Sequence, residues 1–330
     1  MIGLRRKIIS FAAVAVALVV LFLFAVNTGS LQVSPGQLFG GLFIEYDPDV
    51  ATVYDLRFPR IFIAMVGGAA TAVSGVLLQA VIRNPLADPG IIGINAGASF
   101  AAILITTFVP TLFFFTPLFA FLGGLVAFGL VYALSWKGGL SPLRIILVGA
   151  AVSAMFTGIS SALDSGTGSS MSSVTSIVNA NITMKTWSDF WTLLGYAVVG
   201  LALAVCVWRR CDLLALSDKT ARSIGVNVDR TRIFVSCIAV LLASISTAII
   251  GPISFLGLIV PHIARLLVGS GHKWLIPFSI VLGAFCLLLA DTIGRTIAAP
   301  YEISAAVIMS VIGGPAFILL LKRAGAGYGE

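Results

Sequence analysis

Ten apolar stretches follow one another along the chain, separated by polar segments that contain most of the charged residues. Each stretch is close to the ~20 residues that an α-helix needs to cross the hydrocarbon core of a bilayer. The stretches cover residues 8–26, 61–82, 91–113, 117–135, 143–163, 190–208, 231–250, 252–270, 274–293 and 303–321. The pattern predicts an all-α polytopic membrane protein with ten transmembrane helices, which form a single transmembrane domain over residues 1–330.

The basic residues are unevenly distributed over the segments between these stretches. If the N-terminus is cytoplasmic, Arg57, Arg60, Lys185 and Arg295 fall on the outer side, and the other 16 of the 20 Lys and Arg residues fall on the inner side. Membrane proteins concentrate Lys and Arg in their cytoplasmic loops. The distribution therefore predicts a multi-pass protein of the cytoplasmic membrane with both termini in the cytoplasm.

The composition agrees with a protein that folds in lipid. Hydrophobic residues make up 59% of the chain, charged residues make up 10%, and the mean hydropathy is +1.09. These values lie outside the range of water-soluble domains, so the net charge of +7 reflects topology and not a nucleic-acid surface. The four cysteines and two histidines form neither a disulfide framework nor a zinc motif, and we expect no metal site.

Small residues recur at helical spacing on two of the stretches. Gly67, Thr71 and Gly75 share one face of the second stretch, which predicts close packing against another helix. The fifth stretch carries a more polar face, formed by Gly149, Ser153, Thr157 and Ser161. That face fits a wetted path and a helix contact equally well.

The longest charged segment on the inner side covers residues 209–232. Ser217 is a suitable N-cap for a short helix from Asp218 to Ile224, and Gly225 can end that helix in left-handed geometry. Such a helix could lie on the membrane surface as an anchor. It could equally project into the cytosol and insert into a cleft on a partner.

Arginines flank two of the stretches on the side where basic residues are scarce. Arg57 and Arg60 precede the second stretch and could be lipid anchors or contacts for an external partner. Asp291 and Arg295 are four residues apart near the outer end of the ninth stretch, a spacing that predicts an ion pair.

Five motifs resemble the iron-complex and cobalamin ABC importer permeases, the FecCD/BtuC-like family of type II importers. They are Leu-Arg-Phe-Pro-Arg at 56–60, Arg-Asn-Pro-Leu-Ala-Asp-Pro-Gly at 83–90, Ala-Arg-Ser-Ile-Gly-Val at 221–226, Gly-Pro-Ile-Ser-Phe-Leu-Gly-Leu-Ile-Val-Pro-His-Ile-Ala-Arg at 251–265 and Ala-Asp-Thr-Ile-Gly-Arg at 290–295. The resemblance covers nearly the whole chain. It implies ten transmembrane helices in each of two subunits that enclose one central path.

The resemblance also implies roles for individual residues. Arg57, Arg60 and Arg295 match arginines that receive acidic residues of a substrate-binding protein. The segment 213–226 matches the helices that couple the permease to its ATPase, with Leu213, Leu216, Ser217, Asp218, Ala221, Arg222 and Gly225 as the coupling residues. The fifth stretch and the polar segment 164–188 resemble the lining of the translocation path, to which Gly149, Ser153, Thr157 and Ser161 are assigned.

The partners implied are a second permease subunit, identical or paralogous, two cytosolic ATPase subunits and an extracytoplasmic binding protein or lipoprotein. The chain lacks the Gly-x-x-x-x-Gly-Lys-[Ser/Thr] phosphate-binding motif, so we expect no enzymatic activity in it, and ATP and Mg to be used by the ATPase subunits. Residues 184–189, 221–230 and 275–278 resemble Gram-positive haem permeases. Haem and ferric siderophores both remain open as cargo, and cobalamin is the alternative.

A different class of protein, the ion-coupled secondary transporter, needs acidic or polar coupling sites near the middle of the membrane. Asp88, Asp291 and Glu302 all map towards loops or membrane interfaces, which argues against that class. A neighbouring gene for an ATPase or for a binding lipoprotein would exclude it.

Overall fold

The computed structural model describes residues 3–28, 33–135, 142–167, 182–183, 185–298 and 301–325. These residues form helices and connecting turns, and no strand is found among them. The helices are α1 (Leu4–Asn27), α2 (Pro35–Phe43), α3 (Pro48–Ile82), α4 (Ile94–Phe108), the 3₁₀ helix η1 (Pro110–Phe115), α5 (Thr116–Ser135), α6 (Pro142–Thr167), α8 (Trp187–Cys206), α9 (Trp208–Leu214), α10 (Asp218–Ser223), α11 (Val228–Ile250), α12 (Leu256–Val268), α13 (His272–Thr296) and α14 (Ala305–Gly325).

Each of the ten predicted spans corresponds to one helix, so the all-α prediction is confirmed. Among the described residues, seven segments are long and apolar enough to cross a membrane, and the three remaining spans are the shorter apolar helices at 94–108, 256–268 and 305–319. The second span begins earlier than expected, because Asp47 caps α3 by accepting hydrogen bonds from the backbone N–H groups of Asp49 and Val50. Pro48 occupies the first turn, where its missing N–H costs nothing, and the helix continues through Pro59.

Two spans are shorter than predicted because backbone breaks precede them. α4 begins only at Ile94, after Gly93 adopts a φ of +89°. α12 begins at Leu256, after Phe255 adopts a φ of +65°. The two breaks lie against each other, since the side-chain amide of Asn95 donates to the carbonyl of Ile253 at 3.5 Å. Non-helical backbone in a membrane protein has to be covered by protein or line a cavity, and here it does both.

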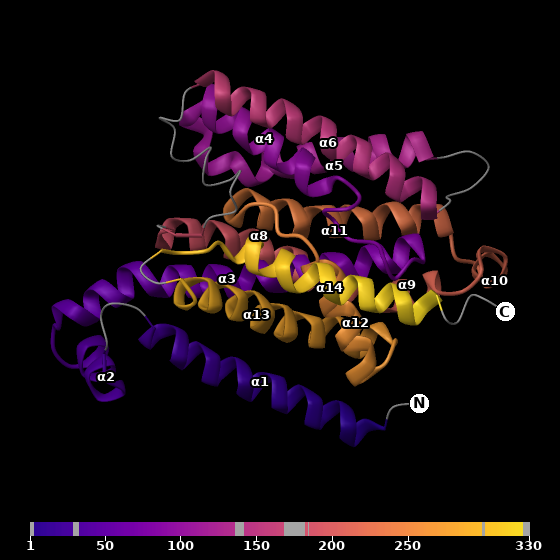
Figure 1. Ribbon diagram of the computed structural model, residues 1–330. Coiled ribbons are helices and arrows are strands. Elements are labelled where there is room, and N and C mark those ends of the chain that lie inside the picture. The colour runs from indigo at the N-terminus through magenta and orange to yellow at the C-terminus, as the bar shows by residue number, and fades with distance from the viewer. Residues whose placement is uncertain are drawn as a thin grey trace.

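The helices are arranged in layers (Figure 1). α3 and α11 run through the middle and contain the most extensively buried segments, whereas α4, α5 and α6 pack on one side and α13 and α1 on the other. Both termini lie at one end of the bundle together with α10, and α2 lies at the opposite end. α1 is largely exposed in this single chain, which fits a helix that faces lipid.

The small-residue face of α3 packs as predicted. The hydroxyl of Ser246 on α11 donates to the carbonyl of Gly67 at 3.1 Å, and Thr71 bonds to the same hydroxyl at 2.9 Å. Gly75 lies directly against the backbone of Gly257 at the start of α12. The three positions therefore fix α3 against two neighbouring helices.

Candidate functional site

A polar cavity of about 200 Å³ opens beside α4 and α6. Its lining consists mainly of small and hydroxylated residues: Gly90, Asn95, Ala96, Ser99, Ile103, Ser153, Thr157, Ser160, Ser161, Pro252 and Ser254. Three of the four residues that the sequence assigned to a translocation path, Ser153, Thr157 and Ser161, are among them. The fourth, Gly149, packs against the backbone of Ile91 and Ile92, where a Cβ would find no room.

The polar face of α6 combines a close helix contact with the lining of a cavity. Gly149 lets α6 approach the segment before α4, and the hydroxylated positions further along the helix line the cavity. Ser153 contributes to both the contact and the cavity lining, because it lines the cavity and its hydroxyl donates to the carbonyl of Gly90 at 3.3 Å. Residues 168–181 and Met184 of the polar segment 164–188 lie outside the described residues, as does the side chain of Asp164.

The other side of the cavity carries polar groups that sequence reasoning missed. Asn95 and Ser99 are one turn apart on α4, and the Asn95 Oδ1 and Ser99 Oγ atoms are buried with no hydrogen-bond partner among the described residues. Buried polar atoms normally have a partner, so these two are suited to water or to a passing polar group. Their i, i+4 spacing on an apolar helix was the signal that could have found them.

Asp88 sits close to this cavity, in the connection between α3 and α4. Its carboxylate accepts a hydrogen bond from the backbone N–H of Gly90 at 2.8 Å, and its Oδ2 atom packs against Gly257. Burial raises the pKa of Asp88 to about 6, against the opposing effect of the backbone N–H groups of Gly90 and Ile91. The residue is in a loop, as the sequence indicated, but it is fully enclosed by the fold and is not a surface charge.

The predicted short helix on the inner side is present as α10. The hydroxyl of Ser217 accepts a hydrogen bond from the backbone N–H of Thr220 at 3.2 Å, and Gly225 has a φ of +84°. The helix ends at Ser223, one residue before the predicted Ile224, and the left-handed glycine then turns the chain towards α11.

Two arginines hold α10 in place. Asp218 pairs with Arg83 at 2.6 Å and with Arg232 at 2.9 Å, and Arg83 also donates to the carbonyl of Leu214 at 2.6 Å. Partial burial alone would raise the pKa of Asp218, but the guanidinium groups of Arg232 and Arg83 outweigh it and hold that pKa below its ordinary value. The end of α3 is thereby connected to α10, a link through Arg83 that the sequence did not reveal.

The proposed coupling residues divide into two groups by exposure. Leu216, Ser217, Arg222 and Gly225 are exposed, whereas Leu213 and Asp218 are partly buried and Ala221 is fully buried. Ala221 and Asp218 therefore fix α10 to the rest of the protein. The exposed group forms the surface that could contact another molecule.

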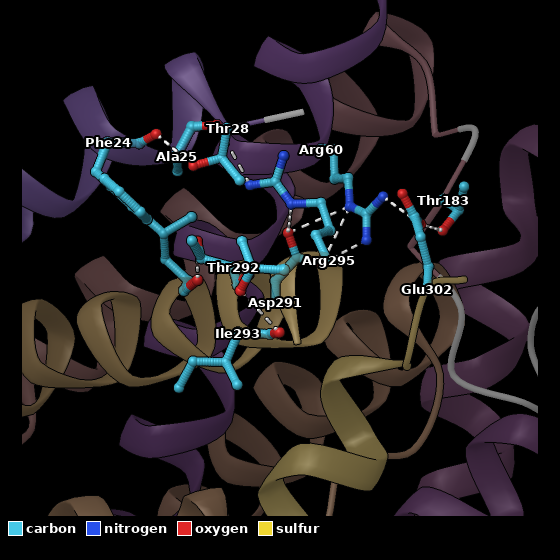
Figure 2. A network of polar contacts seen from close by, with 12 residues as sticks. Phe24, Ala25, Thr28, Arg60, Thr183, Asp291, Thr292, Ile293, Arg295 and Glu302 are labelled. Carbon is cyan, nitrogen blue, oxygen red and sulfur yellow. Dashed lines mark hydrogen bonds and ion pairs between the residues drawn. The ribbon is translucent and has the colours of Figure 1, made fainter. Parts of the chain in front are cut away.

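At the opposite end, four ionised side chains form a cluster (Figure 2). Arg60 donates to Asp291 through Nε and Nη2 at 3.0 and 2.8 Å, and to Glu302 through Nη1 at 2.8 Å. Arg295 pairs with the second oxygen of Asp291 at 3.2 Å, which confirms the predicted i, i+4 ion pair. Asp291 is fully buried and is the one carboxylate in the cluster that contacts both arginines.

The cluster joins segments that are far apart in the sequence. Arg295 reaches the carbonyl of Ala25 at 3.5 Å and Arg57 donates to the carbonyl of Val26 at 2.9 Å, both at the end of α1. Glu302 also accepts a hydrogen bond from the hydroxyl of Thr183 at 2.8 Å. These contacts tie α1, α3 and α13 to the segments that precede α8 and α14 (Figure 2).

Arg60 and Arg295, which the resemblance assigned to contacts with a binding protein, are largely buried in this single chain. Their side chains are only 8% and 6% exposed, and both act as internal partners of Asp291. Arg57 is only partly buried, so it is more accessible to solvent than Arg60. Glu302, which sequence reasoning placed at an interface without a role, is the partly exposed member that closes the cluster.

Comparison with known proteins identifies the family to which the chain belongs. The family model described as the FecCD transport family matches residues 17–323. The chain belongs to the FecCD transport family. The family assignment that the five motifs suggested is thereby confirmed, and the protein is a multi-pass membrane permease.

Curated relatives and solved structures agree with the family assignment. The "Probable heme-iron transport system permease protein IsdF" of Staphylococcus aureus strains bovine RF122 / ET3-1 and Newman is 40% identical over 317 residues, which is 96% of this chain and 96% of the relative. A structure assigned to the metal-chelate type of ABC transporter, in an inward-facing conformation, has a TM-score of 0.80 and 26% identity over 96% of this chain and 99% of that chain. PsaBC from Streptococcus pneumoniae, solved with a Fab, shares the fold with a TM-score of 0.60 and 16% identity over 87% of this chain and 95% of that chain.

Proposed function

We propose that this chain is the permease subunit of an ABC importer that moves an iron complex into the cytoplasm. The observation that carries the proposal is the full-length match to IsdF, which a heme-iron transport system uses as its permease. The polar cavity supports it, because Ser153, Thr157 and Ser161 line an opening that a second permease subunit can complete into a path.

The other components follow from this role. A second permease subunit would face the cavity side of α6, and two cytosolic ATPase subunits would bind ATP and Mg and contact the exposed face of α10. An extracytoplasmic binding protein or lipoprotein would deliver the cargo. With the ATPase subunits bound at α10, both termini and α10 are cytoplasmic, in keeping with the excess of basic residues on that side.

Cargo identity can be tested by transport. We expect proteoliposomes that contain the permease, its ATPase and its binding protein to move haem or a ferric siderophore across the bilayer only when ATP is supplied on the side that carries the ATPase. Competition between haem, a hydroxamate and a catecholate complex then ranks the cargoes. Uptake that needs a proton or sodium gradient and no ATP would overturn the proposal.

Coupling through α10 can be tested at Gly225. Proline fixes φ near −65° and cannot adopt the φ of +84° found here, so Gly225→Pro should distort the turn after α10 and weaken ATPase co-purification at least severalfold. Gly225→Asn is the matched control, because asparagine tolerates left-handed geometry and the space around Gly225 is open. Normal co-purification and uptake in the proline variant would remove the coupling role.

Docking of a binding protein is proposed for the surface around the outer ion cluster. Since Asp291 and Glu302 already neutralise Arg60 and Arg295, Arg57 is the arginine whose charge can be reversed with least damage to the fold. We expect Arg57→Glu to slow association with the binding protein more than Arg57→Gln does at low salt. The difference should disappear at 1 M salt, where the Debye length is ~3 Å. Equal association rates for both variants and wild type at low salt would exclude Arg57 from the docking surface.

A further inference from the structure

An apolar cleft of about 470 Å³ lies between the N-terminal halves of α1 and α13. Its lining is Ile8, Phe11, Ala12, Lys273, Trp274 and Pro277. The N-terminal starts of α1 and α13, whose residues line the cleft, lie towards the end of the bundle where both termini are found (Figure 1). It is separate from the polar cavity, from α10 and from the outer ion cluster, and nothing in the proposed transport cycle uses it.

Two lysines lie beside this cleft, since Lys273 is part of its lining and Lys7 approaches the lining residue Trp274. The Lys7 ammonium lies 5.8 Å from the centre of the Trp274 ring, and the Lys273 ammonium lies 6.0 Å from the centre of the Trp208 ring. Phe11 and Pro277 follow the two lysines by four residues each, so they lie about 6 Å deeper along their helices. Both helices start at this end, and the cleft therefore has a cationic rim and an apolar floor one turn below it.

The surrounding charges strengthen the positive rim. Arg5 and Arg6 immediately precede Lys7, and the first turn of α1 contains no acidic residue and no side-chain cap for its free N–H groups. Asp212 is the carboxylate at the start of α13, and it is engaged by His272, whose backbone N–H and Nδ1 lie 3.0 and 2.7 Å from it. Among the described residues no carboxylate pairs with Lys7 or Lys273, so both ammonium groups can interact with an anion from outside the chain.

We propose that this cleft is a binding site for one anionic phospholipid, such as phosphatidylglycerol, from the leaflet at this end of the protein. An acyl chain would lie along Ile8, Phe11, Ala12 and Pro277, and the phosphate would lie between the ammonium groups of Lys7 and Lys273. Lipid is the expected occupant because α1 is an exposed apolar helix of a membrane protein. Tryptophans such as Trp274 and Trp208 are typical of the depth at which headgroups meet acyl chains.

Charge selects the lipid class. Basic pockets between transmembrane helices favour anionic headgroups, and each lysine near an anionic surface is worth roughly fivefold in affinity. A zwitterionic lipid offers the same acyl chains without the net charge. The site should therefore distinguish phosphatidylglycerol from phosphatidylcholine with identical acyl chains.

Native mass spectrometry of the full-length chain in a neutral detergent tests the proposal. Bound phosphatidylglycerol and phosphatidylcholine would be titrated separately, and soluble sn-glycerol 3-phosphate would serve as a headgroup without acyl chains. Removal of both charges in the Lys7→Gln, Lys273→Gln double variant should weaken phosphatidylglycerol binding by about 25-fold. The matched control is Lys219→Gln with Arg230→Gln, which removes two exposed charges from the same end but outside the cleft.

A second variant tests the floor without changing charge. Ala12 is exposed and lines the cleft, so Ala12→Trp should fill it and reduce phosphatidylglycerol binding while the protein stays folded. Four outcomes would overturn the proposal: equal binding of phosphatidylcholine, equal binding of the soluble headgroup, an equal loss in the control variant, and unchanged binding in both cleft variants. Selective loss of phosphatidylglycerol in the two cleft variants alone would establish the site.

Discussion

Replacing Asp291 with asparagine should destabilise the folded permease by about 3–5 kcal/mol, the cost of removing one partner from a buried ion pair. Asp291 is fully buried and provides the contacts for both Arg60 and Arg295, whose side chains are themselves almost completely buried. Asparagine keeps the size of the side chain but removes its charge. Two guanidinium groups would then share only Glu302, which pairs with Arg60 from a partly exposed position.

Equilibrium unfolding in mixed micelles measures this loss. Asp229→Asn is the matched control, because Asp229 pairs with Arg222 at 3.1 Å on the surface, where the two side chains are 55% and 59% exposed. Exposed pairs contribute at most ~1 kcal/mol, so the control should stay close to wild type. Equal destabilisation by the two substitutions would show that the cluster in Figure 2 is hydrated and contributes no more than a surface pair.

The sequence predicted the ten apolar helices because apolar stretches of membrane-spanning length are a local property, whereas it gave no sign of the shorter helices α2 and α9. It located the ends of the apolar helices less well where the decisive contact is not apolar. The start of α3 depends on the Asp47 cap, which lies in a polar segment with no membrane signal. The starts of α4 and α12 depend on left-handed turns at Gly93 and Phe255. A count of apolar residues detects neither turn, because both lie inside apolar stretches.

The candidate site was predictable only where its residues share one helix. The Ser153, Thr157 and Ser161 face of α6 could be inferred from spacing, but its partners Asn95, Ser99 and Ser254 come from other segments. The same limit applies to the outer cluster. Asp291 and Arg295 are one turn apart and could be paired from the sequence, whereas Arg60 and Glu302 are 242 positions apart and meet only in the fold.

The contact between α3 and α12 should be the most sensitive packing position in the small-residue face. At Gly75 an added Cβ would lie 2.6 Å from the Cα of Gly257, and still closer to its carbonyl oxygen. Every atom it meets belongs to backbone, so no flexible side chain can move aside. We expect Gly75→Ala to push the two helices apart and to cost about 1–3 kcal/mol of unfolding free energy, the usual range for overpacking.

The displacement should also reach the polar cavity, which gives Gly75→Ala a second readout. Gly257 packs against Asp88, and its carbonyl accepts a hydrogen bond from Gln79 at 3.4 Å, so both contacts change when α12 moves. Gly129→Ala on α5 is the control, because a Cβ there meets nothing within 4 Å and alanine favours helix by up to ~1 kcal/mol. The two variants should therefore change stability in opposite directions in the same micelle assay. A Gly75 variant as stable as the Gly129 variant would mean that α3 and α12 are not in contact at this position, and the tight crossing beside the cavity would have to be abandoned.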